Sequence, residues 1–346
     1  MNSVKLCANR LQEISAGGHP RHVTSSEPSR RDCLRAATSN AMGIAASCAI
    51  RSGVLAAQER RGLKIFINWD MEGSSGIFSR EQAWYWENGV REQVAAEAHE
   101  LLTADVNSAS AAALAAGVTE LIVCDTHHGG GNVIKEKLLS DSRITYLHRS
   151  VGIADGKRRW MPGLDQTVAG LMLPGHHAKA STEAAFLPHA WSFEWLDFTI
   201  NGQSVGEIGI ETCYAGHWDV PLVFVQGDEA ACYEARQQFP GVVTAAVKRG
   251  GKNPELSTGM DPDSARRETA RRITEAIENL RAGKMRPYKP ALPMTITLRM
   301  RTVDAAAKAA QRPGVQRIDD HTVEARVGRQ ADVVKWLLGT GLDMAP

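Results

Sequence analysis

Carboxylate and imidazole side chains follow three of the apolar runs in this 346-residue sequence. The three segments are Asp70-Met71-Glu72-Gly73, Asp125-Thr126-His127-His128 and Pro174-Gly175-His176-His177. In open α/β sheets, ligands bind at the carboxyl ends of the strands, so three such ends form one constellation if the runs are neighbouring strands. Mixed imidazole and carboxylate ligands suit zinc or a similar divalent transition metal. The pattern therefore predicts a metal or catalytic site.

Two of the carboxylates, Asp70 and Glu72, are two positions apart. If the chain stays extended there, both side chains leave on the same side and can face one ion. Taken singly, each is more typical of a turn or cap residue than of a ligand, and the coincidence of three strand ends is what favours a ligand role. Glu207 stays open between two interpretations, because Ser204 and Glu207 also fit a capping box in which the glutamate returns to the backbone of the cap residue.

The histidines leave further choices open. His127 is followed by His128, and His176 by His177, so the residue pattern does not say which member of each pair faces an ion. A single histidine after a strand is commonly just a satisfied polar group. His189 follows a proline, and the pattern alone is typical of a structural turn residue there.

The elements that must position these residues begin at Leu63, where apolar runs start to alternate with helical patterns. This alternation predicts an α/β fold with a mainly parallel sheet flanked by helices, a three-layer arrangement. The expected helices are residues 91–116, closed by Gly117, and 264–280. The expected strands are 63–69, 120–124, 168–173 and 221–225, with a hairpin at 197–205 that turns at Asn201-Gly202.

A catalytic domain is predicted over residues 63–290, followed by a smaller C-terminal α/β subdomain over 291–346. Prolines 287, 290 and 293 mark the boundary. The subdomain pattern is strand, Ala-rich helix, strand and helix, with strands at 293–300 and 322–327 and the last helix at 330–338. Nothing in it is typical of catalysis, so packing or assembly is its expected role.

The composition excludes several classes of protein. Forty Lys and Arg against 39 Asp and Glu give a net charge of +1, which argues against nucleic-acid binding through bulk positive charge. No charge-free run of about 18 apolar residues is present, so stable membrane insertion is not expected. Six cysteines are too few for a disulfide scaffold.

The first 57 residues have the texture of a leader. Ser29-Arg30-Arg31-Asp32-Cys33-Leu34-Arg35 is similar to a twin-arginine export signal, and it continues into an apolar, Ala-rich stretch and a small-residue end at Ala56-Ala57. We expect export to the periplasm or the cell exterior, and a cytoplasmic location if the leader does not function. Residues 1–57 hold seven Lys and Arg against three Asp and Glu, which leaves 33 against 36 in the remainder. A basic leader thus precedes a mildly acidic remainder of the chain.

From Leu63 to the C-terminus, the sequence resembles the zinc-dependent D-aminopeptidases of the DppA type. Five motifs carry the resemblance in the family's order and at similar spacing, although Asn68 stands where the family usually has serine. The motifs are Asp70-Met71-Glu72-Gly73, Asp125-Thr126-His127, Gly175-His176-His177-Ala178-Lys179-Ala180-Ser181, Pro188-His189-Ala190 and Val205-Gly206-Glu207-Ile208-Gly209.

The resemblance implies two zinc ions per subunit and chooses among the open alternatives. Asp70 would bridge both ions. Glu72 and His177 would complete one ion's ligands, and His127 and Glu207 those of the other. The neighbouring His128 and His176 would then be supporting or surface residues, and His189 would correspond to the family's catalytic histidine.

The implied chemistry is hydrolysis of the N-terminal peptide bond of short peptides, with release of D-amino acids such as D-alanine. Two divalent ions that share a carboxylate can lower the pKa of a bound water from 15.7 toward roughly 7 and polarise the scissile carbonyl. His189 could move protons between the attacking water and the leaving amine, a contribution of about 10²- to 10⁴-fold. The preference for D-residues comes from the resemblance and not from the residues themselves.

The same resemblance implies a ring-like homo-oligomer. Two alternative functions remain: a metal-dependent amidohydrolase acting on another amide, and a non-catalytic metal- or peptide-binding protein that kept the site and lost turnover. Aromatic residues could line a substrate channel, although such residues beside strands more often belong to a core or an interface. They are Trp84, Tyr85, Trp86, Trp191, Trp195 and Trp218.

Overall fold

A seven-stranded sheet carries most of the chemistry-bearing residues. The computed structural model describes residues 62–148 and 160–335. The strand order is β3-β2-β1-β4-β7-β8-β9, and every neighbouring pair is parallel except β8 and β9. The strands are β1 (Lys64–Trp69), β2 (Glu120–Asp125), β3 (Ile144–His148), β4 (Gly170–His176), β7 (Leu222–Asp228), β8 (Val243–Gly250) and β9 (Ser257–Gly259).

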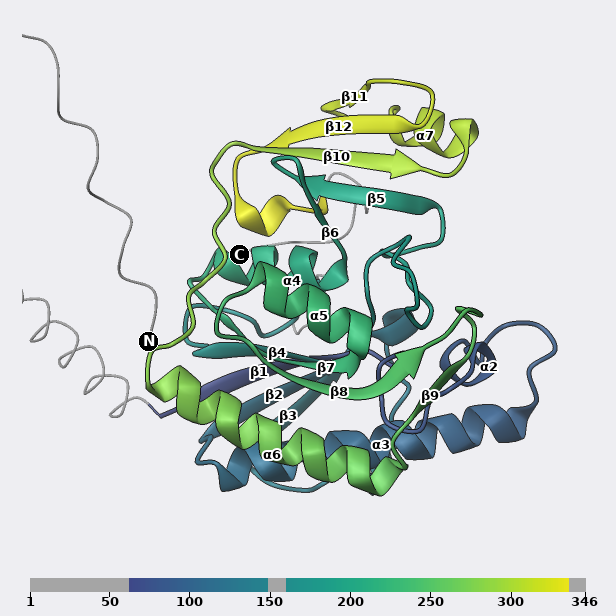
Figure 1. Ribbon diagram of the computed structural model, residues 1–346. Helices are drawn as coiled ribbons and strands as arrows, with labels where there is room; N and C mark the ends of the chain where they lie inside the picture. The colour runs from purple at the N-terminus through teal and green to yellow at the C-terminus, as the bar shows by residue number, and fades with distance from the viewer. Residues whose placement is uncertain (1–61, 149–159, 336–346) are drawn as a thin grey trace, which may run out of the picture. The chain divides into compact units, whose positions relative to one another are not determined.

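Helices cover both faces of this sheet, which confirms the predicted three-layer α/β fold (Figure 1). Helices α3 (Glu92–Ala115) and α6 (Pro262–Arg281) pack side by side against one face, and α4 (Glu207–Gly216) and α5 (Glu229–Gln238) lie on the other. Two separate apolar clusters fill the two interfaces. Because β1, β2, β4 and β7 are buried on both sides, they read in sequence as continuous apolar runs.

A second sheet has the order β11-β12-β10-β5-β6 and is antiparallel throughout. It is built from β5 (Trp195–Ile200), β6 (Gln203–Val205), β10 (Met294–Met300), β11 (Val315–Arg317) and β12 (Thr322–Val327), with α7 (Val303–Ala309) against it. The strands expected to form a separate C-terminal subdomain from residue 291 therefore pair with the hairpin of β5 and β6. Pairing between residues that lie about 100 positions apart in sequence depends on tertiary structure and leaves no local signal.

The remaining short elements are α2 (Arg80–Ala83) and three 3-10 helices, η1 (His127–Gly129), η2 (Lys135–Lys137) and η3 (Gln330–Asp332). Helix starts follow local capping chemistry. Asp261 accepts a hydrogen bond from the amide of Ser264 with Pro262 in the first turn of α6, and Asp228 accepts one from the amide of Ala231 at the start of α5.

Several elements were not predicted from the sequence. They are β3, β8, β9 and β11 among the strands and α4 and α5 among the helices. The half-exposed strand β3 and the alternating burial of β8 give weaker patterns than the fully buried strands. Helix α4 is buried on nearly all sides, so it lacks the polar stripe that marks an amphipathic helix.

Two sequence predictions fall outside the described residues. The export leader over 1–57 lies there entirely, and the predicted last helix ends at residue 338, past Lys335. Within the described residues, no helix is long and apolar enough to cross a membrane. Cys124, Cys213 and Cys232 are buried.

Candidate metal centre

The carboxyl ends of β2, β1 and β4 lie next to one another, as the strand order requires. Asp70 follows β1 directly, His127 comes two residues after the end of β2, and His177 follows β4. Glu207 opens α4, and His189 comes from the loop between β4 and β5. The structure thus brings together all six residues that the sequence singled out, and all are buried or nearly so.

One group of donor atoms is formed by Asp70, Glu72 and His127, whose ligand atoms lie within 4.8 Å of one another. His127 Nδ1 lies 2.8 Å from Asp70 Oδ1 and 3.2 Å from Glu72 Oε2. The other ring nitrogen, Nε2, lies 2.7 Å from the carbonyl oxygen of Ala83. A proton on Nε2 satisfies that carbonyl and leaves Nδ1 as the nitrogen that faces the carboxylates, which is how metal-binding histidines are commonly held.

A second group is formed by Asp70, His177 and Glu207, again within 4.8 Å. His177 Nε2 lies 3.6 Å from Asp70 Oδ2 and 3.4 Å from Glu207 Oε1. Its Nδ1 lies 3.0 Å from the carbonyl oxygen of Ala178, so this ring is also oriented by the backbone. Asp70 belongs to both groups, with one carboxylate oxygen directed at each.

The donor atoms form three overlapping groups, and one of them contains Glu72 and His177, the pair that the resemblance implied for one ion. Asp70 belongs to the other two groups, once with Glu72 and His127 and once with His177 and Glu207. No group found in the described residues contains both His127 and Glu207. The reason is the strand order, because β2 and β4 lie on opposite sides of β1 and their histidines approach Asp70 from opposite sides.

The donor set fits two divalent ions. Glu72 Oε2 and His177 Nε2 are buried and have no hydrogen-bond partner, although such atoms are costly to leave unpaired. Both residues are members of the donor groups described above. Three carboxylates and two imidazoles match the ligand chemistry of zinc.

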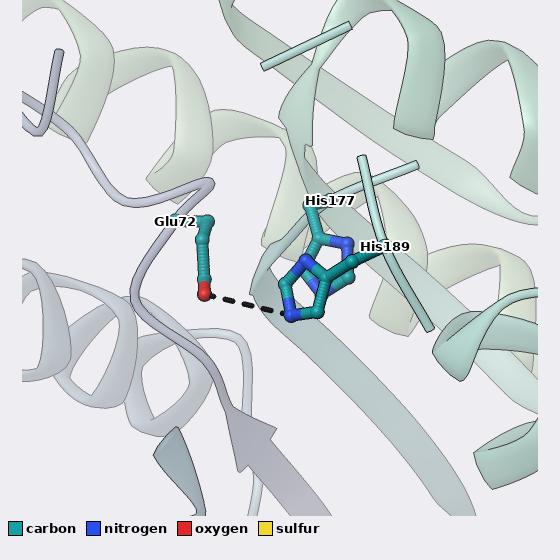
Figure 2. Close-up of side chains that lie close together, drawn as sticks. All are labelled: Glu72, His177 and His189. Atoms are coloured by element: carbon teal, nitrogen blue, oxygen red, sulfur yellow. Dashed lines mark ion pairs between the residues drawn. The ribbon is translucent and has the colours of Figure 1, made fainter. Parts of the chain in front are cut away.

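His189 belongs to the third group, with Glu72 and His177, and it stacks on His177 with ring centroids 3.8 Å apart and planes 9° apart (Figure 2). Its Nδ1 lies 2.8 Å from the carbonyl oxygen of Leu187. Its Nε2 lies 3.9 Å from Glu72 Oε1 and 3.8 Å from Glu207 Oε1. The ring therefore directs one nitrogen across the centre, between a carboxylate of each group.

The electrostatics of the centre favour cations. Burial lowers the pKa of His177, but the neighbouring Glu207, Glu72 and Asp70 outweigh it and raise that pKa to about 10. Burial lowers the pKa of His127 as well, and Glu72 and Asp70 bring it well above its usual value. For His189, burial and the charge of His177 lower the pKa, which favours a neutral imidazole. In the metal-free protein, protons thus occupy the positions that divalent ions would take.

The alternatives for Glu207 and the paired histidines are resolved in the structure. Gly206, not Ser204, is the N-cap of α4, so Glu207 closes no capping box and accepts a hydrogen bond from the amide of Trp191 at 2.8 Å. His176 turns away from both groups and contacts Glu211 at 2.9 Å. His128 stacks on Trp86 with ring centroids 3.9 Å apart.

Glycines let the backbone close around the centre. Gly175 has φ +76°, and a Cβ there would lie 1.8 Å from the carbonyl oxygen of Asp70. Gly73 donates to the carbonyl of Gly175 at 2.6 Å, and Asp70 donates to Pro174 at 3.0 Å. These contacts attach the segment after β1 to the end of β4 and bring Asp70 close to His177.

The centre opens into a cavity of about 490 Å³. Of the aromatic residues expected near a channel, Trp84, Trp86 and Trp191 line it, whereas Trp195 packs in the core. Trp84 also supports the centre directly, because its Nε1 donates to Glu72 Oε1 at 2.7 Å. The sequence did not single out this contact, since the tryptophan is 12 residues from its partner and lies in a loop.

Comparisons with known proteins agree with this geometry. A family model described as D-aminopeptidase matches residues 63–338. A D-aminopeptidase of Bacillus subtilis (strain 168) is 29% identical over 257 residues, which cover 73% of this chain and 87% of that protein. The solved structure described as the Zn-dependent D-aminopeptidase DppA from Bacillus subtilis, a self-compartmentalizing protease, has a TM-score of 0.71 and 28% identity, and the match covers 80% of this chain and 96% of that one.

Proposed function

Because the chain belongs to the D-aminopeptidase family and is a zinc aminopeptidase by that membership, we propose that it holds two zinc ions and releases N-terminal D-amino acids such as D-alanine from short peptides. The observation that carries the proposal is the pair of donor groups that share Asp70, with His189 directed between them. The description of the Bacillus subtilis relatives as D-aminopeptidases supports the D-preference.

The ligands follow from the donor groups. Glu72, His127, His177 and Glu207 would hold the two ions, and Asp70 would be shared by both. Bound zinc supplies a Lewis acid that polarises the scissile carbonyl and lowers the pKa of a coordinated water toward roughly 7. The carbonyls of Ala83 and Ala178 hold the two imidazoles in the tautomers that ligation needs.

His189 is the proposed catalytic residue. Its Nδ1–H donates to Leu187, which leaves the lone pair of Nε2 directed toward the reacting centre. The lowered pKa keeps this nitrogen available as a base near neutral pH. It can take a proton from the attacking water and pass it to the leaving amine, the general acid-base role that contributes about 10²- to 10⁴-fold. Burial of the ring excludes water that would compete for that proton.

The test is an assay of purified protein loaded with zinc. It should release D-alanine from D-alanyl dipeptides, and Asp70→Ala or His177→Ala should lose both zinc and activity. His189→Ala should keep two zinc ions per chain and lose at least about 10²-fold in kcat. No release from any D- or L-aminoacyl substrate by fully loaded protein would refute the proposal, and a wild type that binds zinc without turnover would indicate a binding protein.

Assembly and location are part of the same proposal. The solved relative is described as self-compartmentalizing, which supports a ring-like homo-oligomer for this chain. Light scattering or native mass spectrometry of the purified protein would measure the subunit number. The leader over 1–57 supports export by the twin-arginine route. A reporter fused to residues 1–62 should leave the cytoplasm, and its retention there would contradict export.

A further inference from the structure

Lys248 is a buried cation that the proposed reaction does not use. It lies on β8, and 3% of it is exposed. No other lysine or arginine within residues 62–148 and 160–335 is buried to this degree. Moving an ammonium group out of water costs several kcal/mol unless polar partners replace the water. A buried lysine beside a metal centre therefore calls for partners that explain it.

Its partners are backbone carbonyls of the segment that carries two of the metal ligands. Lys248 Nζ donates to the carbonyl oxygen of Glu72 at 2.6 Å and also to that of Ile77. Both residues lie in the segment between β1 and α2 that starts at Asp70. One ammonium on β8 thus connects two points of this segment, five residues apart, to the central sheet.

The surroundings hold the ammonium in place. The rings of Phe78 and Phe186 lie 5.6 and 5.2 Å from Nζ, within the range of a cation–π interaction. Asp105 and Asp228 add electrostatic attraction. Asp105 also accepts a hydrogen bond from the amide of Ser75 at 2.8 Å, so a second charged group holds the same segment.

The contact matters for the carboxylate of Glu72. Trp84 holds the side chain of Glu72, and Lys248 holds its backbone. Zinc binds carboxylate oxygens at about 2.0–2.2 Å, so a backbone displacement of about 1 Å removes a ligand from its ion. Lys248 does not line the cavity, so it has no direct contact with a substrate.

We propose that Lys248 is a positioning residue of the metal centre, which fixes the Asp70–Ile77 segment so that Glu72 can bind zinc. The inference rests on the proposed zinc centre. Loss of groups that orient metal ligands typically costs 10- to 100-fold in metal affinity or activity. The effect of losing Lys248 should fall on the ion held by Glu72.

The experiment compares Lys248→Met with Lys179→Met as a matched control. Methionine keeps an unbranched apolar stem and removes the ammonium group. Lys179 lies two residues from His177, but its Nζ donates to Ser204 Oγ at 2.7 Å and contacts no part of the Asp70–Ile77 segment. Both zinc dissociation constants are measured by chelator competition, together with the melting temperature and the zinc concentration that gives half-maximal activity.

Lys248→Met should bind one of the two ions 10- to 100-fold more weakly, need more zinc for half-maximal activity by the same factor, and regain activity at saturating zinc. Lys179→Met should match the wild type. Wild-type zinc affinity in Lys248→Met, or an equal loss in both variants, overturns the proposal. If Lys248→Met does not fold, Lys248→Arg decides. Its planar guanidinium cannot place one point charge between the two carbonyls, so it should weaken one ion at least fivefold, and unchanged affinity overturns the proposal.

Zinc affinity also separates this inference from the proposed function. If the wild type binds two zinc ions and releases no amino acid, the proposed aminopeptidase reaction fails while the zinc affinity of Lys248→Met still decides the role of Lys248. If the wild type binds no zinc, both fail.

Discussion

Replacing Trp84 by phenylalanine tests how far a single hydrogen bond supports the metal centre. Trp84 is 7% exposed, and its Nε1 donates to Glu72 Oε1 at 2.7 Å. Its ring packs 4.5 Å from that of Phe193 and 5.4 Å from that of His189, measured between centroids. Phenylalanine keeps an aromatic ring in this position and removes the N–H, so the change falls mainly on Glu72.

The expected magnitude follows from the charge of the acceptor. The pKa of Glu72 is raised by burial, but His127, His177 and His189 bring it well below its usual value, so the carboxylate is ionised at neutral pH. A hydrogen bond to a charged group contributes about 1.5–3 kcal/mol. At about 1.4 kcal/mol for each factor of ten, its loss corresponds to roughly 10- to 150-fold in zinc affinity.

The assay is chelator competition for zinc at constant pH, with a thermal melt to confirm folding. Trp218→Phe is the control, because that tryptophan packs on Tyr214 with centroids 4.9 Å apart and lines no part of the cavity. Trp84→Phe should weaken zinc binding by the stated factor and Trp218→Phe should not. A folded Trp84→Phe with zinc affinity within about twofold of the wild type would refute the reasoning.

Three further predictions concern the backbone, the metal and pH. Gly175→Ala should lower the free energy of unfolding by more than the roughly 1–2 kcal/mol that a left-handed backbone costs a residue with a side chain. The reason is that the added Cβ would also overlap the carbonyl oxygen of Asp70. A denaturant melt with the wild-type midpoint would contradict this. Removal of zinc should lower the melting temperature measured by calorimetry, since zinc at 100 times its dissociation constant adds about 2.7 kcal/mol to the free energy of unfolding. An unchanged melting temperature would show that the native protein binds no zinc. In zinc-free protein, burial lowers the pKa of His176, but Glu211 outweighs it and raises that pKa to about 9. This contribution to stability is fully present below about pH 6.5 and is lost as the pH rises through 9. Unfolding free energies measured from pH 6 to 10 should therefore fall in the wild type and fall less steeply in Glu211→Gln, in which His127 and His177 still contribute. An equal slope in both would contradict the pairing.

The α/β class and the candidate residues could be predicted from the sequence because both depend on the order of neighbouring residues. A strand buried on both faces must be continuously apolar, so β1, β2 and β4 are visible as runs, and the polar residues that end them are visible as interruptions. Asp70, His127 and His177 could be singled out for that reason. The resemblance then selected His127 and His177 over their neighbours, and the structure brings both beside Asp70.

Long-range contacts were beyond the sequence. Glu72 lies near both His127 and His177 because β2 and β4 flank β1, and no local pattern encodes strand order. The joining of β5 and β6 with β10–β12 has the same cause. Support from Trp84 and Lys248 depends on partners 12 and 176 residues away.

What the sequence determined by itself is therefore the set of metal-ligand candidates and the edge of the sheet on which they lie. The tertiary structure alone decided which donor atoms lie close together, which backbone carbonyl each histidine ring contacts and which groups hold Glu72 in place. The physical reason is that side-chain type and strand periodicity are local properties of the sequence. Coordination of an ion instead needs atoms from distant segments within about 4 Å of one another, and only the folded chain fixes those distances.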